Sequence, residues 1–174
     1  MKHYRIKKSN IDNKGLYAAK NIKAGTKIIY YKGKLITKKE TERNPKYDNE
    51  KAIYLFNINS RYDLDGDFEH NTARLINHSC NPNCEVAGKG LKLWIFALRN
   101  IKKNEELTYD YGFGYDENYK DYICKCGSDN CCGYIVREGS RWRIKKSKSL
   151  RWEKKKYYLY LQKTHFQIIF LETG

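Results

Sequence analysis

The sequence predicts a mostly β fold, of the β-rich α+β class, and two observations lead to this prediction. Short runs of β-branched and aromatic residues recur between glycine, asparagine and lysine residues, which is typical of strands separated by turns. The chain lacks the alternation of strands with long helices that a doubly wound sheet requires, and no Gly-x-Gly-x-x-Gly motif follows a predicted strand. A length of 174 residues suffices for one compact domain with extra chain at the ends.

The apolar patterns predict four strands and very little helix. The strands are expected at residues 26–36, 51–59, 91–101 and 105–113. A short helix is predicted to begin at Thr37, because the Thr37 hydroxyl and the Glu40 carboxylate can cap each other's backbone amides. Pro45 should end or interrupt this helix. One further helical turn is predicted at residues 71–75.

The charge balance bears on the partner of the protein. The chain carries 35 Lys and Arg residues against 20 Asp and Glu residues, a formal net charge of +15. This excess favours a polyanionic or acidic partner such as nucleic acid or a nucleoprotein. The alternative is that the positive charge only keeps the protein soluble. No apolar run is long enough to cross a bilayer and the first residues do not resemble a secretory signal. We therefore expect no membrane partner and a soluble intracellular protein, in the nucleus or on chromatin if the source or its host is eukaryotic; the oligomeric state is left open.

Three stretches of different composition are expected. Residues 1–119 hold the predicted strands, residues 120–137 hold a cysteine cluster, and residues 138–174 form a basic extension with ten Lys and Arg residues and three acids. In the extension, Trp142 and Trp152 are interleaved with basic residues. Such a pattern can bind phosphates and stack on bases, act as a nuclear-targeting run, or form a solvated face. The pattern does not decide among the three.

The six cysteines are clustered rather than spread along the chain. In a chain without an export signal, clustered cysteines indicate a metal site before they indicate disulfides. The spacing Cys-x-Cys-x4-Cys, formed by Cys124, Cys126 and Cys131, supplies three thiolates, which leaves a tetrahedral zinc ion one ligand short. By spacing alone, Cys132 could replace Cys131.

Three motifs together carry a family resemblance. They are Asn-His-Ser-Cys-Asn-Pro-Asn-Cys at 77–84, Glu-Leu-Thr-Tyr-Asp-Tyr-Gly-Phe at 106–113, and the cysteine spacing at 124–131. In this order they closely resemble the signature of SET-domain proteins with a post-SET zinc segment. Three weaker segments also resemble the family: residues 14–18 its N-terminal cofactor loop, residues 31–33 its Tyr-x-Gly strand, and residues 62–74 the stretch before its Asn-His motif. The resemblance covers about residues 5–137.

The resemblance implies a function and an architecture. It implies an S-adenosylmethionine-dependent protein-lysine N-methyltransferase, built from several small sheets around a threaded C-terminal segment. The implied substrate is a lysine in a protein, and a histone tail or nucleosome is the family's commonest target. The alternative is a catalytically inactive, zinc-containing SET module that binds nucleic acid or a peptide. A nucleic-acid methyltransferase is less favoured, because those enzymes typically use a doubly wound sheet.

The resemblance also assigns roles to individual residues. Tyr111 is the implied main catalytic residue, with Tyr109 and Tyr31 in the lysine channel. The fourth zinc ligand is implied to be Cys80, which would make the metal structural rather than catalytic. The cofactor-binding residues implied are Lys14, Gly15, Leu16, Tyr17, Arg74, Asn77, His78, Tyr134 and Ile135.

An aromatic channel suits this chemistry. A lysine has a pKa of about 10.4 in water, and an apolar channel disfavours the charged ammonium. A tyrosine combines an apolar ring with one hydroxyl that can be placed against the amine. In the family, Tyr at the position of Tyr109 fills space beside the amine, so the resemblance implies a tendency to monomethylation.

The sequence departs from the family pattern at three positions. Asn13 stands where the first glycine of a Gly-x-Gly cofactor loop is usual, and Asn is the non-glycine residue that best tolerates a left-handed backbone. Lys34 stands where Glu is common. Gly66 stands where a small residue such as Ala is usual.

Overall fold

The computed structural model describes residues 2–47 and 54–144. The strands of this part are β1 (Tyr4–Lys8), β2 (Lys14–Ala18), β3 (Lys27–Tyr31), β4 (Lys34–Thr37), β5 (Leu55–Asn57), β6 (Tyr62–Asp65), β7 (Asn77–His78), β8 (Cys84–Lys89), β9 (Lys92–Ala97) and β10 (Thr108–Tyr109). The helical elements are α1 (Lys38–Arg43) and the 3₁₀ turns η1 (Pro45–Tyr47), η2 (Thr72–Leu75), η3 (Tyr119–Asp121) and η4 (Glu138–Ser140). The predictions for residues 145–174 and 51–53 lie outside the described residues.

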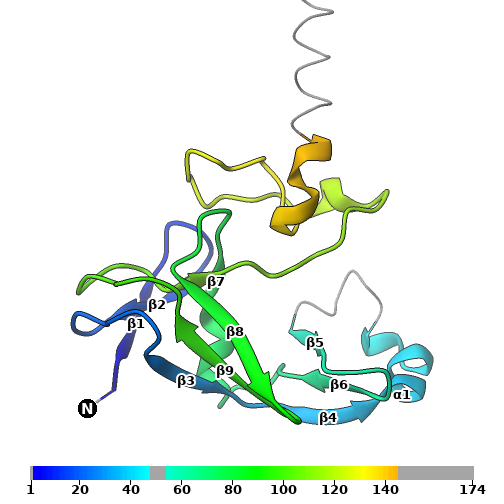
Figure 1. Cartoon of the computed structure of the whole chain (residues 1–174). Helices are drawn as coiled ribbons and strands as arrows, with labels where there is room; N and C mark the ends of the chain where they lie inside the picture. Colours follow the sequence, from blue (N-terminus) through cyan, green and yellow to red (C-terminus); the bar gives the residue numbers. More distant parts are fainter. Residues whose placement is uncertain (1, 48–53, 145–174) are drawn as a thin grey trace, which may run out of the picture.

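The strands form four small sheets. The sheets β1-β2, β3-β9-β8 and β4-β6-β5 are antiparallel, whereas β7 and β10 form a short parallel pair. In Figure 1 the β1-β2 and β4-β6-β5 sheets lie on either side of the β3-β9-β8 sheet, and residues 113–144 lie above them. The predicted mostly β class with several small sheets is confirmed. Within the described residues, no helix has the length and apolar character needed to cross a membrane.

The predicted strand at 26–36 is two strands in different sheets. β3 pairs with β9, whereas β4 pairs with β6. Between them, the Lys32 backbone N–H donates to the Asn71 side chain at 3.2 Å instead of to a strand. A Cβ on Gly33 would lie 2.6 Å from the Asp65 carbonyl oxygen, so the chain can pass this point only as glycine. The break therefore depends on contacts that are distant in sequence.

The predicted strand at 105–113 was also wrong in extent, because only Thr108 and Tyr109 are in a strand. Beyond Tyr109, the Tyr111 N–H donates to the His78 ring instead of to a strand, and Gly112 has φ +74°. A strand at 84–89, not predicted from the sequence, pairs with β9.

The predicted helix is confirmed as α1. The backbone N–H of Glu40 donates to the Thr37 hydroxyl at 3.1 Å, which makes Thr37 the N-cap. The helix ends at Arg43, two residues before Pro45. The helical turn predicted near residue 71 is η2.

The buried residues form two clusters. The larger one lies among the sheets and contains Leu16, Tyr31, Leu64, Ile95 and Leu107 among others. The smaller one joins Cys80 to Cys132, Val136 and Ile144, with Tyr115 and Tyr119 packed against it. The smaller cluster thus draws residues from all three stretches of the chain that differ in composition.

Candidate active site and cysteine cluster

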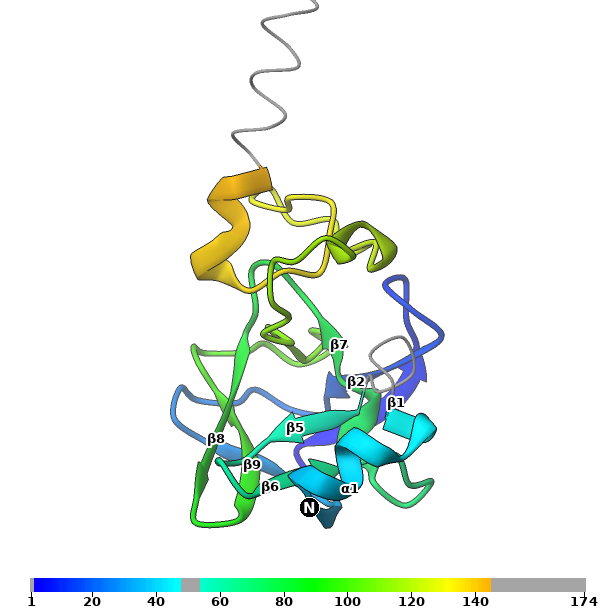
Figure 2. The ribbon, with the colours of Figure 1, turned by 90° about the vertical axis from the view of Figure 1, so that its right-hand side faces the viewer.

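A cavity of about 500 Å³ lies where the loop between β1 and β2, the β7 segment and the C-terminal segment meet. Figure 2 shows this loop rising on the same side of the sheets as the C-terminal segment. The lining residues that the sequence analysis selected are Lys14, Arg74, Asn77, His78, Tyr109, Tyr111, Cys124 and Ile135. The structure thus brings together residues from all three motifs around one cavity that is partly open to solvent.

The parallel pair of β7 and β10 places the first two motifs side by side. Asn77 is opposite Thr108, and His78 is opposite Tyr109. The His78 ring is buried, and its Nδ1 accepts a hydrogen bond of 3.1 Å from the Tyr111 backbone N–H. An accepting Nδ1 assigns the ring proton to Nε2, which lies 3.7 Å from the Cys80 sulfur. Asp110 Oδ1 is 3.8 Å from Nδ1, too far to compete as a hydrogen-bond partner.

Two tyrosines from the second motif form the inner wall of the cavity. The rings of Tyr109 and Tyr111 have centroids 4.9 Å apart. The Tyr111 hydroxyl donates to the Ile76 carbonyl oxygen at 3.0 Å, so the phenolic oxygen presents its lone pairs to other groups. Burial raises the pKa of both Tyr109 and Tyr111 above the usual value of 10.0, so both hydroxyls stay protonated near neutral pH.

Tyr31 lies behind this wall rather than on it. Its ring contacts Phe56 at a centroid distance of 4.7 Å, and Phe56 in turn stacks on Tyr109 at 6.1 Å. A Cβ on Gly66 would lie 2.3 Å from a Tyr31 ring carbon. The absence of a side chain at position 66 therefore leaves room for the buried Tyr31 ring beside Phe56.

The predicted cofactor loop divides into a lining part and a supporting part. Lys14 lines the cavity, as do Ile11, Asp12 and Asn13, of which Ile11 and Asp12 were not expected from the sequence. Asn13 has φ +36°, so its predicted left-handed tolerance is used. The other predicted residues of the loop, Gly15, Leu16 and Tyr17, are not among the lining residues.

Arg74 lines the cavity, as the sequence analysis expected. Its guanidinium lies 5.5 Å from the centre of the Tyr54 ring and 3.8 Å from the Asp67 carboxylate. Among the described residues, no hydrogen-bond partner reaches the buried Arg74 Nε. Buried polar atoms are nearly always paired, so Arg74 Nε, like His3 Nδ1, is an exception among the described side chains.

The structure separates the two candidates for an aromatic or aliphatic contact with the cofactor. Ile135 lines the cavity, whereas Tyr134 belongs to the smaller core and packs on Tyr119 at a centroid distance of 5.1 Å. Ile123 and Lys125 also line the cavity and carried no signal in the sequence.

The four predicted thiolates lie together, with all their sulfur atoms within 4.8 Å of one another: Cys80, Cys124, Cys126 and Cys131. The Cys80 sulfur is 3.9 Å from the sulfurs of both Cys124 and Cys131. A tetrahedral zinc ion with Zn–S bonds of about 2.3 Å requires sulfur separations of about 3.8 Å. The two separations from Cys80 match this value and all four sulfurs lie within 4.8 Å of one another, so the cluster fits a shared zinc ion.

Backbone donors also suit a thiolate cluster. The N–H of Cys80 donates to the Cys126 sulfur at 3.4 Å, and the N–H of Gly133 donates to the Cys131 sulfur at 3.3 Å. Cys132 lies outside the cluster, and its thiol donates to the Tyr134 carbonyl oxygen at 3.2 Å. Cys84 is buried in the larger core, and burial raises the pKa of its thiol to about 12.

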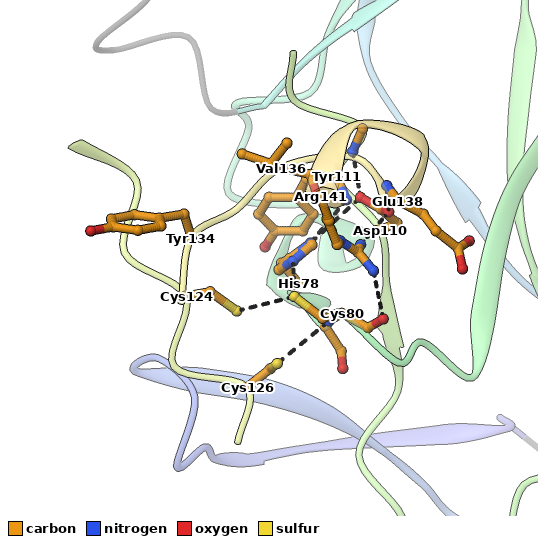
Figure 3. A network of polar contacts seen from close by, with 12 residues as sticks. His78, Cys80, Asp110, Tyr111, Cys124, Cys126, Tyr134, Val136, Glu138 and Arg141 are labelled. Atoms are coloured by element: carbon orange, nitrogen blue, oxygen red, sulfur yellow. Dashed lines mark hydrogen bonds and ion pairs between the residues drawn. The ribbon is translucent and has the colours of Figure 1, made fainter. Parts of the chain in front are cut away.

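Arg141, which the sequence analysis treated only as part of the basic extension, joins the cysteine cluster to the tyrosine segment (Figure 3). Its side chain is buried. It donates to the carbonyl oxygens of Val136 and Cys80, each at 2.7 Å, and to the Asp110 carboxylate at 2.5 Å. Asp110 also accepts from the Glu138 backbone N–H at 3.0 Å. One guanidinium thus connects three segments that are far apart in the sequence.

Fold and site together define a β-rich protein in which paired tyrosines and an Asn-His strand line a cavity that a four-cysteine cluster adjoins at Cys124. Residues 13–112 of the 174 match the SET domain model, and the chain belongs to the SET domain family.

Curated relatives agree with this assignment. The chain is 39% identical over 135 residues to histone-lysine N-methyltransferase trithorax of Drosophila virilis, covering 74% of this chain and 3% of that protein. It is 40% identical over 132 residues to histone-lysine N-methyltransferase 2D of Homo sapiens, covering 72% of this chain and 2% of that protein. It is 38% identical over 136 residues to histone-lysine N-methyltransferase 2B of Homo sapiens, covering 75% of this chain and 5% of that protein. The chain therefore spans only a small part of the length of these relatives.

Replacing Arg141 by Met should destabilise the fold by about 3–5 kcal/mol, because it leaves the Asp110 carboxylate and two carbonyl groups without their buried partner. Chemical denaturation measures the change in the free energy of unfolding. Arg143→Met is the matched control, since Arg143 is exposed and, within residues 2–47 and 54–144, contacts the rings of Tyr115 and Trp142. Equal losses in the two variants would contradict a structural role for the Arg141 contacts.

Proposed function

We propose that the chain transfers a methyl group from S-adenosylmethionine to the side-chain amine of a lysine in a protein substrate. The observation that carries the proposal is the convergence of Asn77, His78, Tyr109 and Tyr111 on one cavity. Membership of the SET domain family and relatives named histone-lysine N-methyltransferases support it. A histone tail is the substrate class that these names favour.

The cavity has the size and donors that the cofactor needs. A volume of about 500 Å³ lies within the usual range of small-molecule sites. Asn77 and His78 would hold the amino-acid end of the cofactor, Arg74 and Lys14 would meet its carboxylate, and Ile135 would pack on the adenine. Bound there, S-adenosylmethionine supplies an electrophilic methyl group on a positively charged sulfur.

Tyr111 would orient the amine rather than remove its proton. Its hydroxyl hydrogen is directed to the Ile76 carbonyl group, so the oxygen can accept from the amine or from methyl C–H groups. Its raised pKa keeps the phenol neutral and excludes it as a base near neutral pH. The neutral amine is favoured instead by the buried rings, which disfavour an ammonium ion.

The cysteine cluster would hold a structural zinc ion. Four thiolates close the coordination sphere, so no position is left for substrate. The ion would fix Cys124 and Ile135, which line the cavity, against the segment that carries Cys80. In this proposal residues 1–119 form the SET domain, residues 120–137 form the zinc segment, and residues 138–174 form a basic extension, for which contact with nucleic acid remains one of the three alternatives.

Incubation with labelled S-adenosylmethionine, followed by mapping of the modified sites, tests the function directly. The substrates are purified histones, nucleosomes and a whole lysate, and we expect labelled lysines. A melting experiment distinguishes the inactive-module alternative. Saturating S-adenosylmethionine should raise the Tm of an enzyme, whereas an unchanged Tm would favour a module that binds only peptide or nucleic acid.

Replacing Tyr111 by Phe should retain the fold and lower kcat by about 100-fold, because one positioned polar group at the reacting atoms is lost. Turnover is measured with a labelled cofactor. Tyr115→Phe serves as the control, since Tyr115 lies outside the cavity lining and packs against the smaller core. Wild-type turnover in Tyr111→Phe would refute the assignment of Tyr111.

Replacing Tyr109 by Phe should shift the products from monomethyl-lysine toward dimethyl- and trimethyl-lysine, because the loss of its hydroxyl enlarges the space beside the amine. Mass spectrometry of a peptide substrate measures the distribution. A distribution identical to that of the wild-type protein would remove the proposed preference for monomethylation.

Replacing Cys126 by Ser should remove zinc and activity together, since three thiolates no longer close the site. Zinc is measured by atomic spectroscopy on the purified protein. Cys132→Ser, outside the cluster, should retain its zinc. Full activity in a zinc-free Cys126→Ser protein would show that the metal does not support the cavity.

A further inference from the structure

We propose that Glu106 is the positioning residue of the cofactor loop, and that position 15 is glycine because the Glu106 carboxylate occupies the space of a Cβ there. The inference rests on the proposed function, since it concerns the same cavity. Glu106 itself is not among the lining residues. Its effect is therefore exerted through the groups that it binds.

Three side chains donate to the Glu106 carboxylate. Oε1 accepts from the Ser9 hydroxyl at 2.7 Å and from the Asn77 amide at 2.8 Å. Oε2 accepts from the Tyr17 hydroxyl at 2.8 Å. A carboxylate is the side-chain group that accepts this number of donors without donating any, so a glutamate satisfies all three partners at once.

These partners hold the loop that forms one wall of the cavity. The Ser9 oxygen also accepts from the Ile11 backbone N–H at 2.9 Å. The Asn77 amide nitrogen lies 3.3 Å from the carbonyl oxygens of Asp12 and Lys14. Residues 11–14 all line the cavity, so the Glu106 carboxylate lies at the base of a network that fixes the shape of this wall.

Gly15 lies directly against this carboxylate. A Cβ there would be 2.3 Å from Glu106 Oε1 and 3.3 Å from the Asn77 amide nitrogen. The φ of Gly15 is not in the left-handed region, unlike those of Gly112 and Gly127. The backbone conformation therefore does not require glycine at position 15, whereas the close approach of Glu106 does.

A purely structural role for Glu106 is the competing explanation. Backbone hydrogen bonds already join β2 to the segment of Glu106, from Leu107 N–H to the Leu16 oxygen at 2.7 Å and from Ala18 N–H to the Glu105 oxygen at 2.9 Å. Loss of the carboxylate should leave these bonds in place. We therefore expect cofactor affinity to change more than folding.

The test is a comparison of Glu106→Gln with Glu105→Gln. In Glu106→Gln, an amide N–H₂ group faces donors in place of one oxygen. Glu105 is the matched control, because its carboxylate binds Arg99 and Asn83 and lies outside the cavity lining. Calorimetry measures the Kd of S-adenosylhomocysteine, alongside the Tm, the zinc content and the kinetic constants.

We expect Glu106→Gln to raise the Kd and the cofactor KM at least tenfold, with a smaller change in kcat and with zinc retained. Glu105→Gln should bind as the wild-type protein does. An unchanged Kd in Glu106→Gln would overturn this inference but not the proposed function. The same holds if both variants lose cofactor affinity equally and in proportion to their loss of Tm. If the wild-type protein binds neither S-adenosylhomocysteine nor S-adenosylmethionine, the proposed function fails, and this inference fails with it.

A second pair of variants tests the reason for Gly15 even where Glu106→Gln folds poorly. Gly15→Ala should lower the Tm by at least about 3 °C in the wild-type background, because Glu106 must be displaced. In a Glu106→Ala background the same change should cost much less, since the space is then open. Equal shifts of the Tm in both backgrounds would refute the explanation.

Discussion

The site depends on the parallel pairing of β7 and β10, which is only two residues long on each side. Its backbone bonds alone would be a weak junction, and buried side chains extend it at both ends. Asn83 accepts from the Thr108 backbone N–H at 2.9 Å and donates to the Glu106 carbonyl oxygen at 2.7 Å. At the other end, the His78 ring takes the place of a strand partner for the Tyr111 N–H. The two tyrosines are thereby held opposite the Asn-His strand.

The same imidazole ties the tyrosine segment to the cysteine cluster. Its Nδ1 accepts from the Tyr111 backbone, while its Nε2 is directed at the Cys80 sulfur 3.7 Å away. Arg141 repeats the connection on a second path, through the Asp110 carboxylate and the Cys80 carbonyl oxygen. Movement of the cluster would therefore be transmitted to the backbone of Tyr111 along both paths. Under the proposal of a structural zinc ion, these two paths would let the metal determine the shape of the cavity without taking part in the chemistry.

The sequence motifs identified most of the groups that meet at the cavity, because each motif is a local pattern whose members stay close in the fold. The contacts that the motifs did not indicate join residues far apart in the sequence. Glu106 is the first residue of the second motif, but its role as an acceptor for the cofactor loop was not expected. Glu106 binds Ser9, which precedes it by 97 residues, and the break after β3 depends on Asn71, 39 residues beyond Lys32. Arg141 could not be distinguished from the other basic residues around it, since only its burial sets it apart. Contacts of this kind leave no periodic or spacing signal.

The departures from the family pattern lie where the structure can accommodate them. Asn13 adopts the left-handed backbone that a glycine would otherwise supply, and its carbonyl oxygen accepts from the Ser9 N–H at 3.1 Å, which closes the loop. Gly66 leaves the volume that the buried Tyr31 ring fills. Lys34 Nζ lies 3.9 Å from the Glu40 carboxylate, and Lys34 is not among the residues that line the cavity. Because none of the three removes a donor or a ring from the cavity wall, they give no physical reason to prefer an inactive module over an enzyme.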